Sequence, residues 1–277
     1  MDAETRAQAA KILLDAYDTH CPVEPLTRRF PGFGVPDAYA VQLAQVRRWV
    51  ADGARIKGHK LGLTSTAMQR QLGVDQPDYG HLLDNMFLAQ HEPIPPGRFL
   101  QPRVEPEIAF VLGKPLAGPG VTVADAIAAV DFVLPALEII DSRIADWKIT
   151  LADTIADNAS SGGVVLGDRP TPLAAVDLSL VGCLLRRDAE IAGTGAGGAV
   201  LGSPVNALVW LANTLAAHGT GLEAGHVVMS GSVTAAVPAR AGGVFSATFA
   251  GLGTVTASFA APAAGEAGAE GGNGSSR

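Results

Sequence analysis

The sequence LQPRVEPEIAFVL, residues 100–112, predicts a β-strand whose two faces differ. Side chains alternate between the faces of a strand, so residues two positions apart point the same way. One face is apolar and carries Val104, Ile108, Phe110 and Leu112. The other face carries Glu105, Glu107, Ala109 and Val111. The strand therefore places two neighbouring carboxylates on one otherwise apolar face.

A second apolar stretch, residues 132–140, predicts another strand, and it contains Glu138 in the run VLPALEII. For Glu105 and Glu107 alone, a solvated strand face is the simpler interpretation. Their apolar neighbours and Glu138 favour a different one, because an unpaired buried carboxylate is costly and like charges repel. Three carboxylates in apolar strands indicate a site for a hard divalent cation such as Mg²⁺ or Mn²⁺, with open positions for water or substrate.

Lys60 lies in an apolar, glycine-flanked segment, GHKLGLTS, residues 58–65. A partly buried ammonium would have a lowered pKa and could serve as an acid or a base. The alternative is a side chain whose stem lies on apolar surface while its charged head stays in water. Taken alone, the segment favours this alternative.

Helices come first along the chain and strands follow. Residues 4–17 have apolar side chains at helical spacing, and a second helix begins at Pro36 and ends before Gly53. We expect its buried face to carry Tyr39, Leu43, Val46 and Val50. Further helices are expected from Thr122 and from Ser203–Pro204, and strands at 227–230, 244–249 and 254–259, the last two as a hairpin. Because few regular βαβ units occur, this order indicates an α+β fold around a rolled, mixed sheet.

We divide the chain into a helical N-terminal segment, residues 1–54, a β-roll domain, residues 55–260, and a tail, residues 261–277. The first boundary follows from the change to short runs punctuated by glycine after the second helix. The tail is rich in Ala, Gly, Glu and Ser, so we expect it to be disordered.

The composition of the 277 residues excludes several classes of protein. Apolar residues make up 48%, charged residues 17%, and the net charge is −7, which is typical of a globular chain without a nucleic-acid partner. We expect no secretion signal and no membrane span, because the start is acidic and no run of about 20 apolar residues occurs. Cys21 and Cys183 fit no metal-binding spacing, so we expect a cytoplasmic protein.

Other patterns carry less weight. GTGAGG, residues 193–198, matches a dinucleotide-binding pattern, but no helix begins at its third glycine, so we expect a loop. The six histidines form no HExxH motif and no close pair. No serine lies in a GxSxG motif, which disfavours a serine hydrolase without excluding other triad geometries.

Five segments, in order, resemble one known family. They are KLGLTS (60–65), QLGVDQPDYG (71–80), QPRVEPEIA (101–109), PALEIIDSRI (135–144) and DTIADNASS (153–161). Over roughly residues 5–260 the chain is similar to the 2-hydroxypenta-2,4-dienoate hydratases, also called 2-keto-4-pentenoate hydratases, of the fumarylacetoacetate hydrolase superfamily. The resemblance implies a mixed β-roll catalytic domain, a divalent metal on Glu105, Glu107 and Glu138, and catalytic roles for Lys60 and Asp78. It also implies substrate contacts from Ser160 and Ser161.

The implied reaction adds water to a 2-hydroxydienoate and gives a 4-hydroxy-2-oxo acid, in the catabolism of aromatic compounds by meta-cleavage. A divalent cation can chelate the carboxylate and the 2-oxygen of such a substrate, as Lewis acid and template. The main alternative is 4-oxalocrotonate decarboxylase, which would release CO₂ through the same chelate. A second alternative is a non-catalytic partner subunit of a pathway enzyme. The resemblance also implies a homo-oligomer, and association with a neighbouring pathway enzyme is a further possibility.

Overall fold

The computed structural model describes residues 1–66, 69–70 and 73–262. Its α-helices are α1 (Ala3–Thr19), α2 (Leu26–Arg29), α3 (Val35–Ala51), α5 (Val123–Ala129), α6 (Leu151–Ala156) and α7 (Pro204–Ala216). Its first strands are β1 (Ile56–Gly62), β2 (Asp78–Leu83), β3 (Phe87–Leu88), β4 (Arg103–Leu112), β5 (Val130–Ile140) and β6 (Ser161–Leu166). The later strands are β7 (Gly182–Arg187), β8 (Glu190–Ala196), β9 (Val227–Met229), β10 (Val237–Pro238), β11 (Val244–Phe249) and β12 (Gly253–Ser258). Residues 263–277 of the predicted tail lie outside the described residues.

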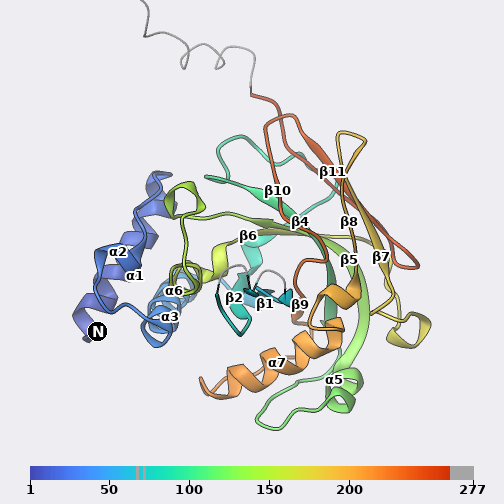
Figure 1. The fold of residues 1–277 in the computed structure, drawn as a ribbon, viewed down its shortest axis with the longest axis horizontal. Coiled ribbons are helices and arrows are strands. Elements are labelled where there is room, and N and C mark those ends of the chain that lie inside the picture. The colour runs from blue at the N-terminus through green and yellow to red at the C-terminus, as the bar shows by residue number, and fades with distance from the viewer. Residues whose placement is uncertain (67–68, 71–72, 263–277) are drawn as a thin grey trace, which may run out of the picture.

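Two sheets form the body of the protein, with the N-terminal helices to one side (Figure 1). The larger sheet has the strand order β2-β1-β9-β4-β5-β6-β3, and β10 pairs with β4. Within it, β1 runs parallel to β9 and β3 parallel to β6, while β4 is antiparallel to β5 and β9. The smaller sheet has the order β12-β11-β7-β8. The expected α+β fold with a mixed, curled sheet is therefore confirmed.

The main core joins the two sheets to α5 and α7. It contains the apolar face that the sequence predicts for β4: Val104, Ile108, Phe110 and Leu112. Two local predictions for elements that pack against this core are confirmed. Thr122 caps α5 by accepting a hydrogen bond from the Asp125 N–H at 3.3 Å, and β11 and β12 form the expected hairpin. These elements pack around β4 and β5, which lie in the middle of the larger sheet.

The N-terminal helices share a second core with α6, the helix that follows β5. The expected inner face of α3 is only partly confirmed: Val46 is buried, but Val50 is 44% exposed, whereas Gln42 and Gln45 are fully buried. The Gln42 side-chain amide donates to the carbonyls of Tyr79 and Ile155, and that of Gln45 donates to the Ala156 carbonyl. Because buried carbonyl groups need donors, polar side chains occupy positions that a hydrophobic pattern assigns to solvent.

The glycine-rich segment at 193–195 is part of β8, so the expectation of a loop there is wrong. Gly193 and Gly195 lie opposite Leu185 and Cys183 in the antiparallel pairing of β8 with β7. A side chain at Gly195 would collide with the Val233 carbonyl. The glycine therefore permits a close backbone approach within a packed sheet, and the phosphate-binding interpretation has no support in this geometry.

One stretch, Gly197–Ala216, is long and apolar enough to cross a membrane, although only its part from Pro204 is the α-helix α7. A span needs about 20 helical residues, and α7 has 13. Its Leu208, Leu211 and Leu215 are fully buried in the main core. We therefore interpret α7 as a core helix.

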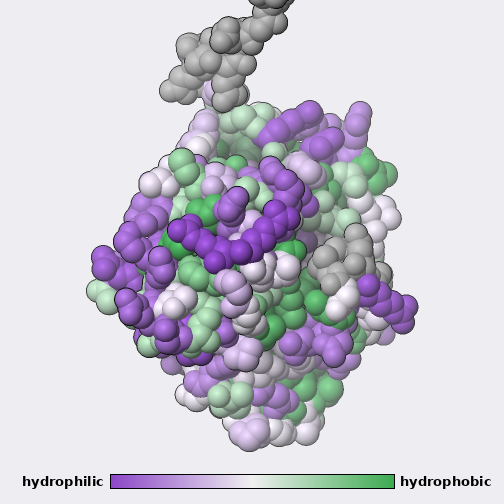
Figure 2. Space-filling view, turned by 60° about the vertical axis from the view of Figure 1, so that its left-hand side comes forward, coloured by the Kyte–Doolittle hydropathy of each residue, from purple (hydrophilic) through white to green (hydrophobic). Residues whose placement is uncertain are grey.

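The face of the molecule that carries the N-terminal helices mixes hydrophilic and hydrophobic areas (Figure 2).

Candidate active site

Three carboxylates converge on one face of the larger sheet. Glu105 and Glu107 lie two residues apart on β4, and Glu138 lies on β5 directly opposite Glu105. One ligand oxygen from each of the three residues lies within 4.8 Å of the others. Glu107 and Glu138 are fully buried and Glu105 is half-buried. The structure thus brings together the three residues that the sequence singles out.

These carboxylates lack the donors that burial requires. Glu107 Oε2 accepts a hydrogen bond from the Gly231 N–H at 2.8 Å. Glu107 Oε1 and both Glu138 oxygens have no hydrogen-bond partner among the described residues. Burial, with the negative charge of Glu138, raises the pKa of Glu105 to about 7 and holds that of Glu107 well above its ordinary value. Unpaired carboxylate oxygens at this spacing fit a hard divalent cation, which would supply the missing positive charge.

Lys60 lies on β1 and reaches the carboxylates from the side. It is 3% exposed, its Nζ lies 3.4 Å from Glu138 Oε1, and it donates a hydrogen bond to the Ala159 carbonyl at 3.0 Å. Burial lowers its pKa, but the surrounding carboxylates, Glu138 first among them, raise it by more, so the pKa of Lys60 lies above its ordinary value. The expected lowering of the Lys60 pKa is therefore wrong, and so is the alternative of a charged head in water: Lys60 is a buried cation.

Asp78 lies on β2, on the same face of the sheet as Lys60. Lys60 pairs with Gly80 and Gly62 with Asp78 across the two strands, so Lys60 and Asp78 are diagonal neighbours. A side chain at Gly62 would collide with the Asp78 carboxylate. Burial raises the pKa of Asp78, although Lys60 lowers it in part. A carboxylate with a raised pKa beside a cation is suited to exchanging a proton.

Ser160 and Ser161 follow α6, at a turn that packs against β2. Ser160 is buried and its hydroxyl donates to Asp157 Oδ2 at 3.3 Å. The Ser161 hydroxyl donates to the Asn158 carbonyl at 2.8 Å. Asn158, Ala159 and Ser160 all have left-handed backbone angles, with φ of 53°, 51° and 52°. Such angles cost roughly 1–2 kcal/mol for a residue with a side chain, and strain of this kind gathers at functional sites.

Sequence reasoning missed the groups that hold this turn. Arg143 is 1% exposed, and its Nε donates to Asp157 Oδ1 at 2.6 Å. Both residues stand within segments that carry the family resemblance, but neither was singled out. The sequence EIIDSRI, residues 138–144, could have indicated this role. Its arginine comes shortly after an apolar strand, and arginine is rarely buried without a charged partner.

Two histidines that are far apart in the sequence form a close pair in the fold. The β1–β2 pairing sets His59 opposite His81, and their ring centroids are 4.8 Å apart. Both are buried, and the Nδ1 atom of each has no hydrogen-bond partner among the described residues. Alternation along β1 places them on the face of the sheet opposite to Lys60. They therefore lie outside the carboxylate cluster.

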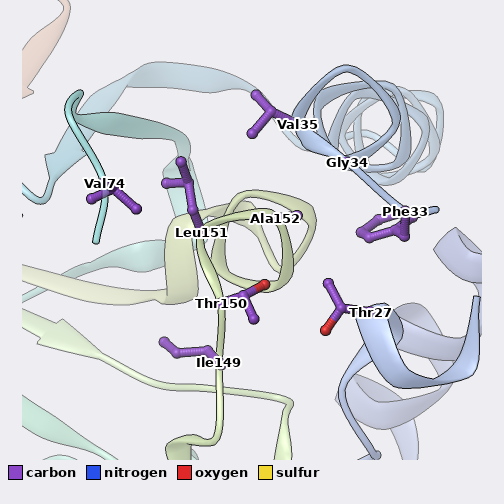
Figure 3. Close-up of a pocket in the computed structure, with 9 residues that line it drawn as sticks. All are labelled: Thr27, Phe33, Gly34, Val35, Val74, Ile149, Thr150, Leu151 and Ala152. Carbon is purple, nitrogen blue, oxygen red and sulfur yellow. The ribbon is translucent and has the colours of Figure 1, made fainter. Parts of the chain in front are cut away.

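A pocket of about 400 Å³ opens at the start of α6 (Figure 3). It is lined by Thr27, Phe33, Gly34, Val35, Val74, Ile149, Thr150, Leu151 and Ala152. None of these nine residues is charged. Val74 precedes Asp78 by four residues, and Leu151 begins the helix that leads to the turn at Ser160. None of the carboxylates of the cluster, nor Lys60 or Asp78, belongs to this lining.

Comparison with known proteins places this site in a recognised class. A family model described as fumarylacetoacetate (FAA) hydrolase C-terminal matches residues 51–260. The structure of 4-oxalocrotonate decarboxylase from Pseudomonas putida G7, complexed with magnesium and adipate, superposes with a TM-score of 0.90 at 38% identity. That match covers 94% of this chain and 98% of the decarboxylase. The chain therefore has the fold of the fumarylacetoacetate hydrolase superfamily.

Sequence relatives narrow the class. The 2-keto-4-pentenoate hydratase of Paraburkholderia xenovorans (strain LB400) is 46% identical over 259 residues, which are 94% of this chain and 96% of the relative. The 2-hydroxyhexa-2,4-dienoate hydratase of Comamonas testosteroni is 43% identical over 258 residues, which are 92% and 97% of the two chains. The chain belongs to the 2-keto-4-pentenoate hydratase family within the fumarylacetoacetate hydrolase superfamily.

Proposed function

We propose that the protein is a divalent-metal-dependent hydro-lyase that adds water to 2-hydroxypenta-2,4-dienoate, or a close homologue, and yields a 4-hydroxy-2-oxo acid. The reaction would serve the catabolism of aromatic compounds by meta-cleavage. The observation that carries the proposal is the cluster of Glu105, Glu107 and Glu138 with the Lys60 ammonium against it. The hydratase relatives, each matched over more than nine-tenths of both chains, support the assignment of the reaction.

The three carboxylates would hold the cation, and Mg²⁺ or Mn²⁺ suits their oxygen ligands. When bound, such a cation supplies Lewis-acid polarisation of a 2-oxo acid and a template for it. Gly231 orients Glu107 through its N–H, which leaves Glu107 Oε1 available for the cation. The three side chains already converge, with one oxygen of each within 4.8 Å of the others.

Lys60 and Asp78 are the candidates for moving protons. Ketonisation takes the proton from the 2-hydroxyl and places one on C5, which leaves an α,β-unsaturated ketone, and water then adds at C4. The Lys60 ammonium can stabilise negative charge that develops on the substrate, because it is buried and held at a fixed place. The Asp78 carboxylate, with its raised pKa, can accept and return a proton on the same face of the sheet. Ser160 and Ser161 would contact the substrate from the turn that holds Lys60.

Three other functions are alternatives to this one, and the experiment below distinguishes the first two from the hydratase. A 4-oxalocrotonate decarboxylase would use the same cation and release CO₂, and the structural match at 38% identity supports it as the runner-up. A non-catalytic partner subunit would have no use for three buried carboxylates beside a buried lysine. A carbon–carbon bond hydrolase would need a Glu–His pair at the site, but His59 and His81 lie on the opposite face of the sheet.

The test is an assay with product identification on a panel of 2-hydroxydienoates with Mg²⁺ or Mn²⁺. Loss of the dienoate absorbance with a 4-hydroxy-2-oxo acid as the product, identified by NMR, would support the hydratase. Release of CO₂ from 4-oxalocrotonate as the main reaction would identify the decarboxylase instead. No turnover of any member, by a protein that binds the cation, would favour the partner subunit.

We further propose that the protein is a cytoplasmic homo-oligomer that associates with no nucleic acid or membrane and that can associate with a neighbouring pathway enzyme. The support is the family resemblance, the low charged fraction of 17% and the two free cysteines. Light scattering at micromolar concentrations measures the mass directly. A single-chain mass throughout that range would contradict the oligomer.

A further inference from the structure

The turn at Asn158, Ala159 and Ser160 contacts Lys60 through one backbone atom. Its Ala159 carbonyl accepts a hydrogen bond from Lys60 Nζ at 3.0 Å. We propose that the buried ion pair between Arg143 and Asp157 is a positioning device for Lys60: it fixes this turn so that the Ala159 carbonyl aims the ammonium at the carboxylate cluster. The inference rests on the proposed function, in which Lys60 acts on the substrate.

Arg143 donates hydrogen bonds at both ends of the turn. Before the turn, Arg143 Nη2 donates to the Asp157 carbonyl at 3.0 Å, and its backbone N–H donates to Asp157 Oδ2 at 3.1 Å. After the turn, Arg143 Nη1 donates to the Ser161 carbonyl at 3.1 Å. The planar guanidinium presents several donors in a fixed geometry, so one side chain defines the separation of the two ends. A lysine could reach only part of this set.

The middle of the turn is held against β2. Asn158 Oδ1 accepts from the His81 N–H at 2.8 Å, and Asn158 Nδ2 donates to the His81 carbonyl at 2.9 Å. A side chain at Gly80 would collide with the Asn158 carbonyl, so the turn and the strand approach closely. The turn is therefore fixed relative to β1 and β2, the strands that carry Lys60 and Asp78.

Ala159 has no functional group except its backbone. It nevertheless adopts a left-handed conformation that alanine disfavours, and it is 2% exposed. The conformation turns its carbonyl to Lys60. Nζ also approaches Glu138 Oε1, at the longer distance of 3.4 Å. Because lysine has four rotatable bonds in its stem, the short contact to Ala159 fixes where the charge lies.

The alternative is that Arg143 stabilises the start of β4 and has no particular effect on Lys60. Asp141 lies 3.6 Å from Arg143 and accepts hydrogen bonds from the N–H groups of Leu100 and Gln101, just before β4. If Arg143 served mainly to place β4, its loss would displace Glu105 and Glu107 and weaken cation binding. If it acts through the turn, cation binding survives and turnover falls. The two explanations differ in a measurable way.

The experiment uses the full chain with Asp157→Asn and Arg143→Lys, each made alone and in the Lys60→Met background. Asparagine keeps an oxygen for Arg143 Nε and removes the charge, while lysine keeps the charge and removes the planar donor set. Arg240→Lys is the matched control, because Arg240 pairs with Asp188 at 3.0 Å on the exposed surface. For each variant we would measure kcat, KM, Mn²⁺ affinity by calorimetry, and Tm.

We expect Asp157→Asn and Arg143→Lys to lower kcat about tenfold or more, with KM and Mn²⁺ affinity within about threefold of the parent. In the Lys60→Met background the same changes should lower kcat at least about fivefold less than they do in the parent, because the group they position is gone and only their effect on Ser160 and Ser161 remains. An equal loss of kcat in both backgrounds would overturn the inference, and so would a parallel loss of Mn²⁺ affinity. A wild-type kcat for Lys60→Met alone would instead refute the role of Lys60 in the proposed function.

A milder variant keeps the inference testable if neither of these folds. The ring of Tyr17 on α1 lies 4.3 Å from the Arg143 guanidinium carbon and covers its face. Tyr17→Leu removes this ring and leaves the ion pair in place. We expect a two- to fivefold loss of kcat that disappears in the Lys60→Met background, with Mn²⁺ affinity unchanged. An unchanged kcat in a folded Tyr17→Leu protein would count against the inference.

Discussion

Glu105 and Glu138 are separated by 32 residues in the chain and occupy directly opposed positions on the antiparallel strands β4 and β5. Cβ atoms of such a cross-strand pair lie roughly 5 Å apart, and like charges there destabilise a sheet. Glu107 adds a third carboxylate from the same face of β4. An arrangement that opposes folding in this way is explained by a cation that the three groups share.

Replacement of one ligand tests that explanation. Glu107→Gln keeps the shape and an oxygen that can accept the Gly231 N–H, and it removes the charge. We expect Mn²⁺ affinity to fall by at least the 10- to 100-fold that loss of an outer-shell partner costs. The Tm of the metal-free protein should stay equal or rise, because repulsion within the cluster is relieved.

The control for this variant is Glu190→Gln, which makes the same change at an exposed position on β8. It should leave Mn²⁺ affinity unchanged. Calorimetric titration of the metal-free proteins gives both affinities. Equal affinity in Glu107→Gln and the parent would show that the cation, if bound, lies elsewhere.

Removal of the metal should abolish turnover and change how stability depends on pH. In the metal-free protein, Glu105 has a pKa of about 7, above the ordinary 4.5. Between these values the folded state binds more protons than the unfolded state, so stability falls as the pH rises from about 4.5 to 7. A bound cation removes this penalty and stabilises by about 2.7 kcal/mol at 100 times its dissociation constant.

We therefore expect the difference in Tm between metal-loaded and chelator-treated protein to grow as the pH rises through this range. Mg²⁺ or Mn²⁺ added back should restore turnover. Other titrating groups contribute equally to both samples, so the difference isolates the cluster. Full activity in a preparation shown to be metal-free by elemental analysis would refute metal dependence.

Lys60→Met distinguishes a chemical role from simple packing. Methionine keeps the apolar stem and loses the ammonium. If Lys60 stabilises charge or moves a proton, kcat should fall by about 10²- to 10⁴-fold, while the cation stays bound because an ammonium has no lone pair to donate. Measurement of kcat, KM and Mn²⁺ affinity on the same protein decides the matter. Lys148→Met, at an exposed position, is the control and should leave kcat unchanged.

The strands and their carboxylates could be predicted because their physical signals are local. The period of two along residues 104–112 fixes which side chains share a face, and Glu138 stands out as a charge in an apolar run. The pairing of strands is not local. Nothing in the residues around His59 indicates that His81 lies across from it, and the inner face of α3 depends on carbonyls of β2 and α6 that only the fold brings near.

The turn at residues 158–160 was unpredictable for another reason. Left-handed backbone is expected at glycine or asparagine, and only Asn158 in this turn fits that preference. Ala159 and Ser160 adopt it because Arg143, which precedes Asp157 by 14 residues, donates hydrogen bonds at both ends of the turn. The pKa of Lys60 was unpredictable because it too depends on residues distant in the sequence. Burial alone predicts a lowered pKa, but four carboxylates raise it above its ordinary value.

The buried histidine pair gives the fold a dependence on pH that is separate from the carboxylates. His59 and His81 are 2% and 3% exposed. Burial lowers the pKa of His81 from 6.5 to about 4, and His218 contributes to the lowering. The pKa of His59 is lowered well below its ordinary value, also chiefly by burial. Both side chains are therefore neutral in the folded protein at pH 7.

Acidification should consequently destabilise the protein through this pair. Between pH 6.5 and about 4 the unfolded chain binds a proton at His81 that the folded chain does not, so stability is complete above pH 6.5 and is lost as the pH falls. The full effect of His81 is on the order of 3 kcal/mol. His81→Phe keeps an aromatic ring beside His59 and cannot titrate, so the loss of unfolding free energy between pH 7 and pH 5 should be smaller in this variant than in the parent. Urea denaturation at both pH values measures it, with the exposed His91→Gln as the control that should match the parent. Identical pH dependence in His81→Phe and the parent would mean that the buried ring is not the source of the acid sensitivity.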